Sequence, residues 1–499
     1  MSGSARNRLP STVRRSREFW HRDQSQMLQL MPGARAAGAM IGRRDLLKMS
    51  ALGALGARVS TALQAEEGTR TAPGSARNCI YIFLCGGPSQ IDLWDLKPDA
   101  PAHIRGPFKP IATNVPGVQI GDLLPRVSRH ADKFAIVRSM NHDTQSHDLG
   151  ILRTLLASQS ELNRPYPVSS TDHPSIGAML SYRFGARGQL PPWVVLPRYF
   201  TTGDRFYKGQ TAGFLGSRYE ALDLGTEKQG SLTRTAFDLE HLDLGKTGQD
   251  LDRLRGRRDL LTSLASRELS RSPGVQQLDG LVERAYNLFA SRGIRQVFDV
   301  TKEDPQTRQR YGLNEYGQSF LLARRLVEAD VRMINVFWTF YGNDGCQFNL
   351  WDNHGAEGSV CGGKNRGHEM MRHDYCCPSF DRAYAALLDD LDQRGLLDST
   401  LVVVVGEFGR TPQINKWAGR DHWASCYAAV LAGGGIRGGS IYGKSDKIAG
   451  YVADNPVSPF DLHATVLRAM GVGPETTVPD PTGRPVRVTD GVPLDDLFG

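Results

Sequence analysis

The sequence lacks any apolar run long enough to remain in a membrane as a helix. Its apolar N-terminal stretch, Met49 to Leu63, is rich in Ala, Leu and Gly, but it is short and carries Arg58. A transmembrane helix needs about 20 consecutive apolar residues. Internal repeats and low-complexity tracts are also lacking. We therefore expect no stable membrane span and no repeat architecture.

A basic surface on the folded part is lacking as well, although the net charge is +7. Residues 1–65 carry eleven Arg or Lys and three acidic residues, so the whole excess of positive charge lies there and the rest of the chain is close to neutral. No nucleic-acid-binding motif or basic stripe follows. The charge pattern therefore excludes nucleic acid as the expected partner.

Cysteine is scarce, with 7 Cys among 499 residues. Because the number is odd, at least one thiol stays unpaired or pairs between chains. Cys79 and Cys85 flank an apolar segment and are expected to be buried thiols.

An export signal is the first feature that is present. Residues 42–48 read GRRDLLK, which fits the twin-arginine pattern in front of a mildly apolar stretch. We interpret residues 40–65 as a twin-arginine signal peptide and residues 1–39 as a disordered or mis-annotated N-terminal extension. The alternative is a basic, disordered tail of a cytosolic protein. The interpretation predicts a periplasmic or otherwise exported protein, and it favours a bound metal because this route carries proteins that fold before export.

The remaining chain, residues 75–499, is expected to form one large α/β domain. Five apolar segments predict buried strands, at 80–84, 134–137, 193–196, 331–338 and 401–405. Helical periodicity appears at 317–328 and at 379–394, where Ser379 is the expected N-cap and Gly395 the expected stop.

The order strand 331–338, helix 379–394, strand 401–405 is a βαβ unit. It predicts a mostly parallel sheet with helices on both faces, which is a three-layer α/β/α sandwich. The polar, Arg-rich residues at about 200–310 are interpreted as a mostly helical excursion on the same domain.

Polar residues follow the predicted strands at the edge where ligands bind in parallel sheets, beyond the carboxyl ends of the strands. These residues are Ser89, Asp92 and Asp95 after the first strand, His142, Asp143, Thr144, Ser146 and His147 after the second, Asp352 and His354 after the strand at 331–338, and Glu407, Arg410, Asp421 and His422 after the strand at 401–405. Carboxylates and imidazoles at one edge suit a divalent metal that activates water or a hydroxyl.

Several of these residues have a structural alternative. The Asp-x-His of WDNHG is also typical of a loop hydrogen-bond pair, and the Asp-His of GRDHW of an N-cap beside a packed histidine. Asp92 and Asp95 also suit a turn. Arg410 either pairs with a structural carboxylate or binds an oxyanion through its fork of donors. Glu407 indicates function, because a carboxylate at the end of a buried strand rarely serves packing.

Longer motifs carry a family resemblance from about residue 40 to the C-terminus. They are GGPSQIDLWDLKP, LLARRLVEADVRMINV, WDNHG, GLLDSTLVVVVGEFGRTP, GRDHW, LAGGGIRGGSIYGKSD and the closing PVSPFDLHATVLRAMGV. Together they resemble an uncharacterised family of exported bacterial proteins, the domain of unknown function 1501. That family is placed in the alkaline phosphatase superfamily as a sulfatase-like member.

The resemblance implies an alkaline phosphatase-like or sulfatase-like fold and a site with one or two divalent metals, Zn or Ca. In that site Asp352 and His354 resemble the pair that binds one metal, with His422 as its late histidine partner. Glu407 resembles the carboxylate of a second metal. Asp421 joins the candidate ligands as the neighbour of His422.

The sequence departs from the superfamily pattern at three places. Cys85-Gly86 stands where an aspartate usually ends the first strand, so Asp92 has to substitute for it. Glu407-Phe408 lacks the usual acid-histidine pair. The Cys-x-Pro-x-Arg sulfatase signature is absent, which argues against formylglycine chemistry.

The nucleophile is therefore Thr144, Ser146 or absent, and His147 and Arg410 complete the catalytic candidates. These residues favour a metal-dependent hydrolase of sulfate or phosphate esters outside the cytoplasm, acting on a small-molecule or glycan ester. The alternative is a catalytically degenerate sulfatase-like protein that binds a glycan or a protein. A phosphomutase-like transfer enzyme is disfavoured, because export separates it from phosphorylated metabolites.

Overall fold

The computed structural model describes residues 76–160, 162–188, 190–202, 205–224, 256, 259–260, 296–338, 340–341, 347–348, 351–355, 367–374 and 376–499. The predicted extension and signal peptide, and most of the predicted excursion at 200–310, lie outside these residues. Within the described part, no helix is both long and apolar enough to cross a membrane.

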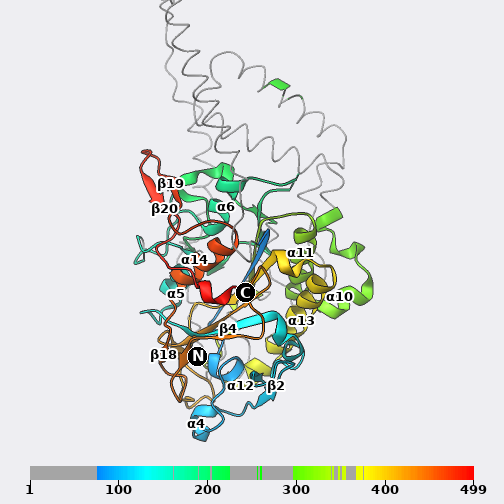
Figure 1. Cartoon of the computed structure of the whole chain (residues 1–499), viewed down its shortest axis with the longest axis vertical. Coiled ribbons are helices and arrows are strands. Elements are labelled where there is room, and N and C mark those ends of the chain that lie inside the picture. Colours follow the sequence, from blue (N-terminus) through cyan, green and yellow to red (C-terminus); the bar gives the residue numbers. More distant parts are fainter. Residues whose placement is uncertain are drawn as a thin grey trace, which may run out of the picture. The chain divides into compact units, whose positions relative to one another are not determined.

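An eight-stranded sheet forms the centre of the domain (Figure 1). Its strands, in spatial order, are β16 (Ile441–Tyr442), β4 (Phe134–Met140), β15 (Tyr427–Ala432), β12 (Thr400–Val405), β1 (Asn78–Leu84), β9 (Met333–Trp338), β5 (Trp193–Leu196) and β8 (Leu222–Asp223). Neighbouring strands are parallel except for β15, which runs antiparallel to β12 and β4. The predicted mostly parallel α/β sheet is confirmed.

The central strand β1 sends alternate side chains into two separate cores. Ile80 and Ile82 pack on one face with helices α11 (Glu315–Glu328) and α13 (Cys377–Gln393). Tyr81 and Phe83 pack on the other face, in the core that holds α5 (His147–Leu155), α6 (Ile176–Phe184) and α14 (Pro459–Ala469). Helices therefore cover both faces of the sheet, and the three-layer α/β/α architecture is confirmed (Figure 1).

The five predicted strands correspond to β1, β4, β5, β9 and β12. β12 reads TLVVVV and is buried at every position, as expected for β-branched residues in a strand covered on both faces. Gly395 follows α13 with a φ of 66°, which is the predicted stop. The predicted N-cap Ser379 is wrong: Cys376 holds that position, because Pro378 is tolerated within the first turn of the helix.

β15 was missed from the sequence. It reads YAAVLA, and its three alanines give little strand preference. Two neighbouring strands and full burial decide its conformation instead.

Short elements surround the sheet. The helices are α3 (Gln90–Leu93), α4 (Ala102–Arg105), α10 (Pro305–Tyr311) and α12 (Gly367–Arg372), and the two-stranded ribbons are β2 (Pro110–Ala112) with β3 (Gln119–Gly121), β6 (Thr201–Thr202) with β7 (Arg205–Phe206), β10 (Phe340–Tyr341) with β11 (Gln347–Phe348), β13 (Gly409–Arg410) with β14 (His422–Trp423), β17 (Lys444–Ser445) with β18 (Val452–Asp454), and β19 (Thr477–Pro479) with β20 (Pro485–Arg487). The β13–β14 ribbon matters for the site, because its register places Arg410 opposite His422.

Candidate metal centre

The candidate site lies where the chain leaves the carboxyl ends of parallel strands. His147 begins α5 after β4, Asp352 follows β9, and Glu407 follows β12. His422 comes from β14. Four segments of the chain thus meet at one edge of the sheet, as the topology predicts for those that follow β4, β9 and β12.

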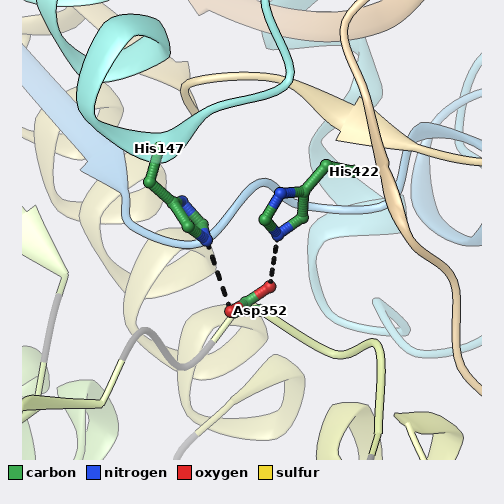
Figure 2. A group of neighbouring side chains, drawn as sticks. All are labelled: His147, Asp352 and His422. Atoms are coloured by element: carbon green, nitrogen blue, oxygen red, sulfur yellow. Dashed lines mark hydrogen bonds and ion pairs between the residues drawn. The ribbon is translucent and has the colours of Figure 1, made fainter.

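Imidazoles converge on the carboxylate of Asp352 (Figure 2). The Nε2 atom of His147 lies 3.3 Å from Oδ2 of Asp352, and Nε2 of His422 lies 3.0 Å from Oδ1. Nε2 of His354 also lies 3.3 Å from Oδ2. The potential ligand atoms of His147, Asp352 and His422 are all within 4.8 Å of one another.

The opposite ring nitrogens of these histidines face oxygen atoms that accept hydrogen bonds. Nδ1 of His147 lies 2.7 Å from Oε1 of Glu407, and Nδ1 of His422 lies 2.9 Å from the carbonyl oxygen of Gln145. A carbonyl or carboxylate oxygen can only accept, so each Nδ1 carries the proton. This fixes the ring orientation and points Nε2 inward, which is the arrangement found around metal-bound histidines.

The charges of the site are strongly coupled. Burial alone would lower the pKa of His147, but the hydrogen bonds to Asp352 and Glu407 outweigh it and raise that pKa to about 9. Burial alone would raise the pKa of Asp352, but Arg410 and the three histidines hold it well below its usual range. The proton on His147 thus places positive charge beside Asp352. A divalent cation bound there would replace that proton and would be held by the same nitrogen and oxygen atoms.

Glu407 is fully buried, and its carboxylate is already occupied. Besides His147, it accepts hydrogen bonds from the backbone N–H of Gly86 at 2.9 and 3.1 Å. Gly86 is the second residue after β1 and has a φ of 116°, a conformation that favours glycine. At the end of the first strand this chain therefore supplies a backbone N–H that binds Glu407.

Arg410 is also fully buried, and it anchors Asp352. Its Nη2 donates to Oδ1 of Asp352 at 2.6 Å and to the carbonyl oxygen of Trp351 at 3.1 Å. Nε and Nη1 donate to the carbonyl oxygens of Gly87 and Arg420. The guanidinium thus pairs with a carboxylate of the protein, that of Asp352; the sequence had left open pairing with a carboxylate or binding of an oxyanion.

The structure does not bring Asp92 or Asp421 to the cluster. Both carboxylate oxygens of Asp92 accept hydrogen bonds from Arg420, at 2.7 and 2.9 Å, in a fully buried pair. Asp421 is exposed and accepts a hydrogen bond from Asn415.

The two candidate nucleophiles lie at the start of α5. Ser146 is the N-cap residue, and its side chain makes no capping hydrogen bond. The hydroxyl of Thr144 accepts a hydrogen bond from the backbone N–H of Ser146 at 3.2 Å. Both residues are therefore next to His147, but no contact of either hydroxyl with Asp352 or His422 is present among the described residues.

Sequence reasoning missed three contributors to the site: Gly86, the carbonyl of Gln145, and Arg420. Gly86 and Gln145 act through their backbones, which leave no side-chain signal in a sequence. Arg420 stands in the motif GRDHW directly before Asp421, and an arginine beside candidate ligands was the available signal.

The comparisons with known proteins give a family match and several distant structural likenesses. Residues 76–498 match the family described as Protein of unknown function (DUF1501). No curated protein matches the sequence. Similar solved structures include the phosphonate monoester hydrolase from Silicibacter pomeroyi, with 12% identity, coverage of 84% of this chain and 76% of that chain, and a TM-score of 0.39.

Two further solved structures are similar at comparably low sequence identity. The phosphonate monoester hydrolase of Agrobacterium radiobacter shows 11% identity, coverage of 84% and 77%, and a TM-score of 0.34. A structure titled for the metabolism of multiple glycosaminoglycans by Bacteroides thetaiotaomicron shows 13% identity, coverage of 80% and 73%, and a TM-score of 0.34.

Proposed function

This chain belongs to the DUF1501 family, and from the geometry of its site we propose that it is a metal-dependent hydrolase of sulfate or phosphate esters that acts outside the cytoplasm. The observation that carries the proposal is the convergence of three Nε2 atoms on Asp352, while each Nδ1 is held by an oxygen atom. Such preorganised nitrogen donors around a carboxylate are costly to assemble unless a cation binds them.

We assign the metal to His147, Asp352 and His422, with His354 in reach as a further donor. This donor set is rich in nitrogen, which favours Zn²⁺ over Ca²⁺ because Ca²⁺ takes oxygen ligands. Glu407 is assigned to the orientation of His147, and Arg410 to the orientation of Asp352. Bound there, the ion would supply Lewis acidity to the ester and to the attacking group.

The oxyanion of the ester is assigned to the first turn of α5. The donors of Arg410 are directed at backbone carbonyls and Asp352, so they are not available to a substrate. The first backbone N–H groups of a helix have no partner within the helix, and the side chain of Ser146 does not cap them. They lie beside His147 and suit a sulfate or phosphate group.

The attacking group is the hydroxyl of Ser146 or Thr144, or a water molecule. Attack at sulfur or phosphorus forms a new bond to the attacking oxygen, breaks the ester bond and releases the alcohol, which takes up the proton of the attacking group. Where a side-chain hydroxyl attacks, water then hydrolyses the sulfated or phosphorylated side chain and restores its hydroxyl. The substrate is a small-molecule or glycan ester met after export through the twin-arginine route, consistent with the signal at residues 40–65.

Metal content tests this proposal first. The mature protein from about residue 66, purified without chelator, is expected to carry about one equivalent of divalent metal, mainly zinc, by elemental analysis. His422→Ala and Asp352→Ala are expected to lose it, whereas His130→Ala, which removes a histidine outside the cluster, keeps it. A folded, metal-free wild type that turns over no sulfate or phosphate ester contradicts the proposal.

One observation favours the second candidate, a degenerate binding protein. Glu407 and Arg410 are both engaged in contacts within the protein. Neither charged side chain is therefore available to contact a substrate. A protein that holds zinc firmly, binds a glycan and shows no turnover across a panel of sulfate and phosphate esters would support this role.

A further inference from the structure

A second buried ion pair lies next to the metal centre. Asp92, in α3, and Arg420 are both fully buried, and their side chains form a bidentate pair at 2.7 and 2.9 Å. Oδ2 of Asp92 also accepts a hydrogen bond from the hydroxyl of Ser89 at 2.6 Å. An arrangement of this kind has a defined geometry, because the guanidinium fork matches a carboxylate.

The remaining donors of Arg420 hold two other parts of the chain. Nη1 donates to the carbonyl oxygens of Thr411 and Pro412, which follow β13, and Nη2 donates to the carbonyl oxygen of Ile104 in α4 at 2.7 Å. Every nitrogen of the guanidinium is thereby bonded. The loop that connects β13 to β14 is tied to α3 and α4 through this one side chain.

This loop leads directly into one of the residues assigned to the metal, His422 at the start of β14. His422 lies two residues after Arg420, and the carbonyl oxygen of Arg420 accepts a hydrogen bond from Nη1 of Arg410 at 3.0 Å. Arg410 in turn holds Oδ1 of Asp352, which is also the oxygen that faces His422. The ion pair is thus connected to the site in two ways. The backbone leads from Arg420 to His422, and Arg410 links the carbonyl oxygen of Arg420 to Asp352.

The surrounding chain packs closely against the pair. Gly106 has a φ of 71°, and a Cβ atom at this position would lie 3.0 Å from Nη2 of Arg420 and 3.3 Å from Oδ1 of Asp92. A larger residue there would press on the guanidinium and the carboxylate. The pair therefore has closely packed surroundings as well as a full set of hydrogen bonds.

We propose that Asp92 and Arg420 are positioning residues that set the separation of His422 from Asp352 and so define the geometry of the metal centre. Neither touches the metal. Asp92 thereby acts on the site through Arg420 and is not a ligand. The proposal rests on the proposed metal site for its functional consequence, but the positioning itself is a property of the protein without metal.

The test compares Asp92→Asn and Arg420→Lys with Asp172→Asn. Asp172 forms a buried ion pair with Lys208, at 2.7 Å, outside the site, so its variant controls for the loss of any buried pair. Zinc affinity is measured by competition with a chelator at a temperature where circular dichroism shows every variant folded. We expect Asp92→Asn and Arg420→Lys to bind zinc about 10-fold to 100-fold more weakly, and Asp172→Asn to bind like the wild type.

Crystal structures of the same variants without metal separate this proposal from the proposed function. We expect the distance between Nε2 of His422 and Oδ1 of Asp352 to exceed the 3.0 Å of the wild type in both pair variants and to be unchanged in Asp172→Asn. A wild type that binds no zinc contradicts the proposed function. The crystal structures then test by themselves whether Asp92 and Arg420 set the distance between His422 and Asp352.

Wild-type affinity together with an unchanged His422–Asp352 distance in both pair variants overturns the proposal. If neither variant folds, Ser89→Ala replaces them, because it removes one hydrogen bond to Asp92 and leaves the ion pair in place. Its zinc affinity is then expected to fall by a few-fold, and an unchanged affinity and distance overturn the proposal.

Discussion

At the scale of single residues, the centre of the site is one carboxylate with four partners. Oδ1 of Asp352 receives Arg410 and His422, and Oδ2 receives His147 and His354. Arg410 is fully buried and its donors are held by several oxygen atoms, so it fixes Oδ1 in place. The histidines can exchange a proton for a metal, so the other oxygen and the imidazoles form the variable part of the site.

The role of Glu407 separates a one-metal site from a two-metal site. If Glu407 only orients His147, Glu407→Gln is expected to keep about one equivalent of zinc and to weaken its binding about 10-fold. The measurement is elemental analysis together with chelator competition. The matched control is Glu315→Gln, at a buried glutamate outside the site that pairs with Arg198.

The opposite result would be a change in stoichiometry. A wild type with two equivalents of metal, of which Glu407→Gln loses one, would make Glu407 a metal ligand and restore the assignment implied by the family resemblance.

At the scale of elements, the site depends on how helices α5 and α14 and the β13–β14 ribbon are held on the sheet. His463 in α14 is fully buried, and its Nε2 lies 2.7 Å from the carbonyl oxygen of Thr154 in α5. Its Nδ1 is buried and has no hydrogen-bond partner within the described residues. This contact joins α14 to the helix that begins with His147.

The protonation of His463 predicts a pH dependence of stability. Burial lowers its pKa to about 4, only partly opposed by backbone hydrogen bonds. The unfolded chain, with a histidine pKa near 6.5, then binds the proton more readily than the folded chain between pH 6.5 and 4. This group's effect is absent above about pH 6.5, and stability is lost as the pH falls, by about 2 kcal/mol at pH 5.

The measurement for this prediction is urea unfolding of the wild type and of His463→Gln at pH 7 and pH 5. The difference in unfolding free energy between the two proteins is expected to shift by about 2 kcal/mol in favour of the variant at the lower pH. The control is the exposed histidine variant His103→Gln. An equal pH dependence in wild type and His463→Gln would contradict the prediction.

At the scale of the whole molecule, charge and function are divided along the chain. All of the net positive charge lies in residues 1–65, and the family match covers residues 76–498. The charged N-terminal part holds the predicted export signal, and the proposed site is built from residues of the family domain. Export and chemistry can be tested separately for this reason.

The export prediction concerns Arg43 and Arg44. Replacing both with Lys is expected to leave the unprocessed precursor in the cytoplasm, because the pathway reads the arginine pair. Cell fractionation with immunoblotting measures this. The sequence offers a matched control in the upstream pair Arg14-Arg15, whose replacement with Lys is expected to leave export unchanged. Processing that depends on Arg14-Arg15 instead would contradict the assignment of residues 40–65.

Much of the fold followed from local sequence. The runs at β1, β9 and β12 are apolar and β-branched, so they indicated strands buried on both faces, and their alternation with α11 and α13 indicated parallel pairing. β15 did not follow, because an alanine-rich strand has no local preference that distinguishes it from a helix.

The sequence by itself determined which residues could meet: the parallel topology sends the segments after β4, β9 and β12 to one edge, so His147, Asp352 and Glu407 were already candidates. Only the tertiary structure decided which partners each one contacts. Glu407 faces His147 and Gly86, Arg410 faces Asp352, and Asp92 faces Arg420. The physical reason is that a charged side chain is assigned its role by its partners within about 3 Å, and those partners come from residues up to 328 positions away in the chain.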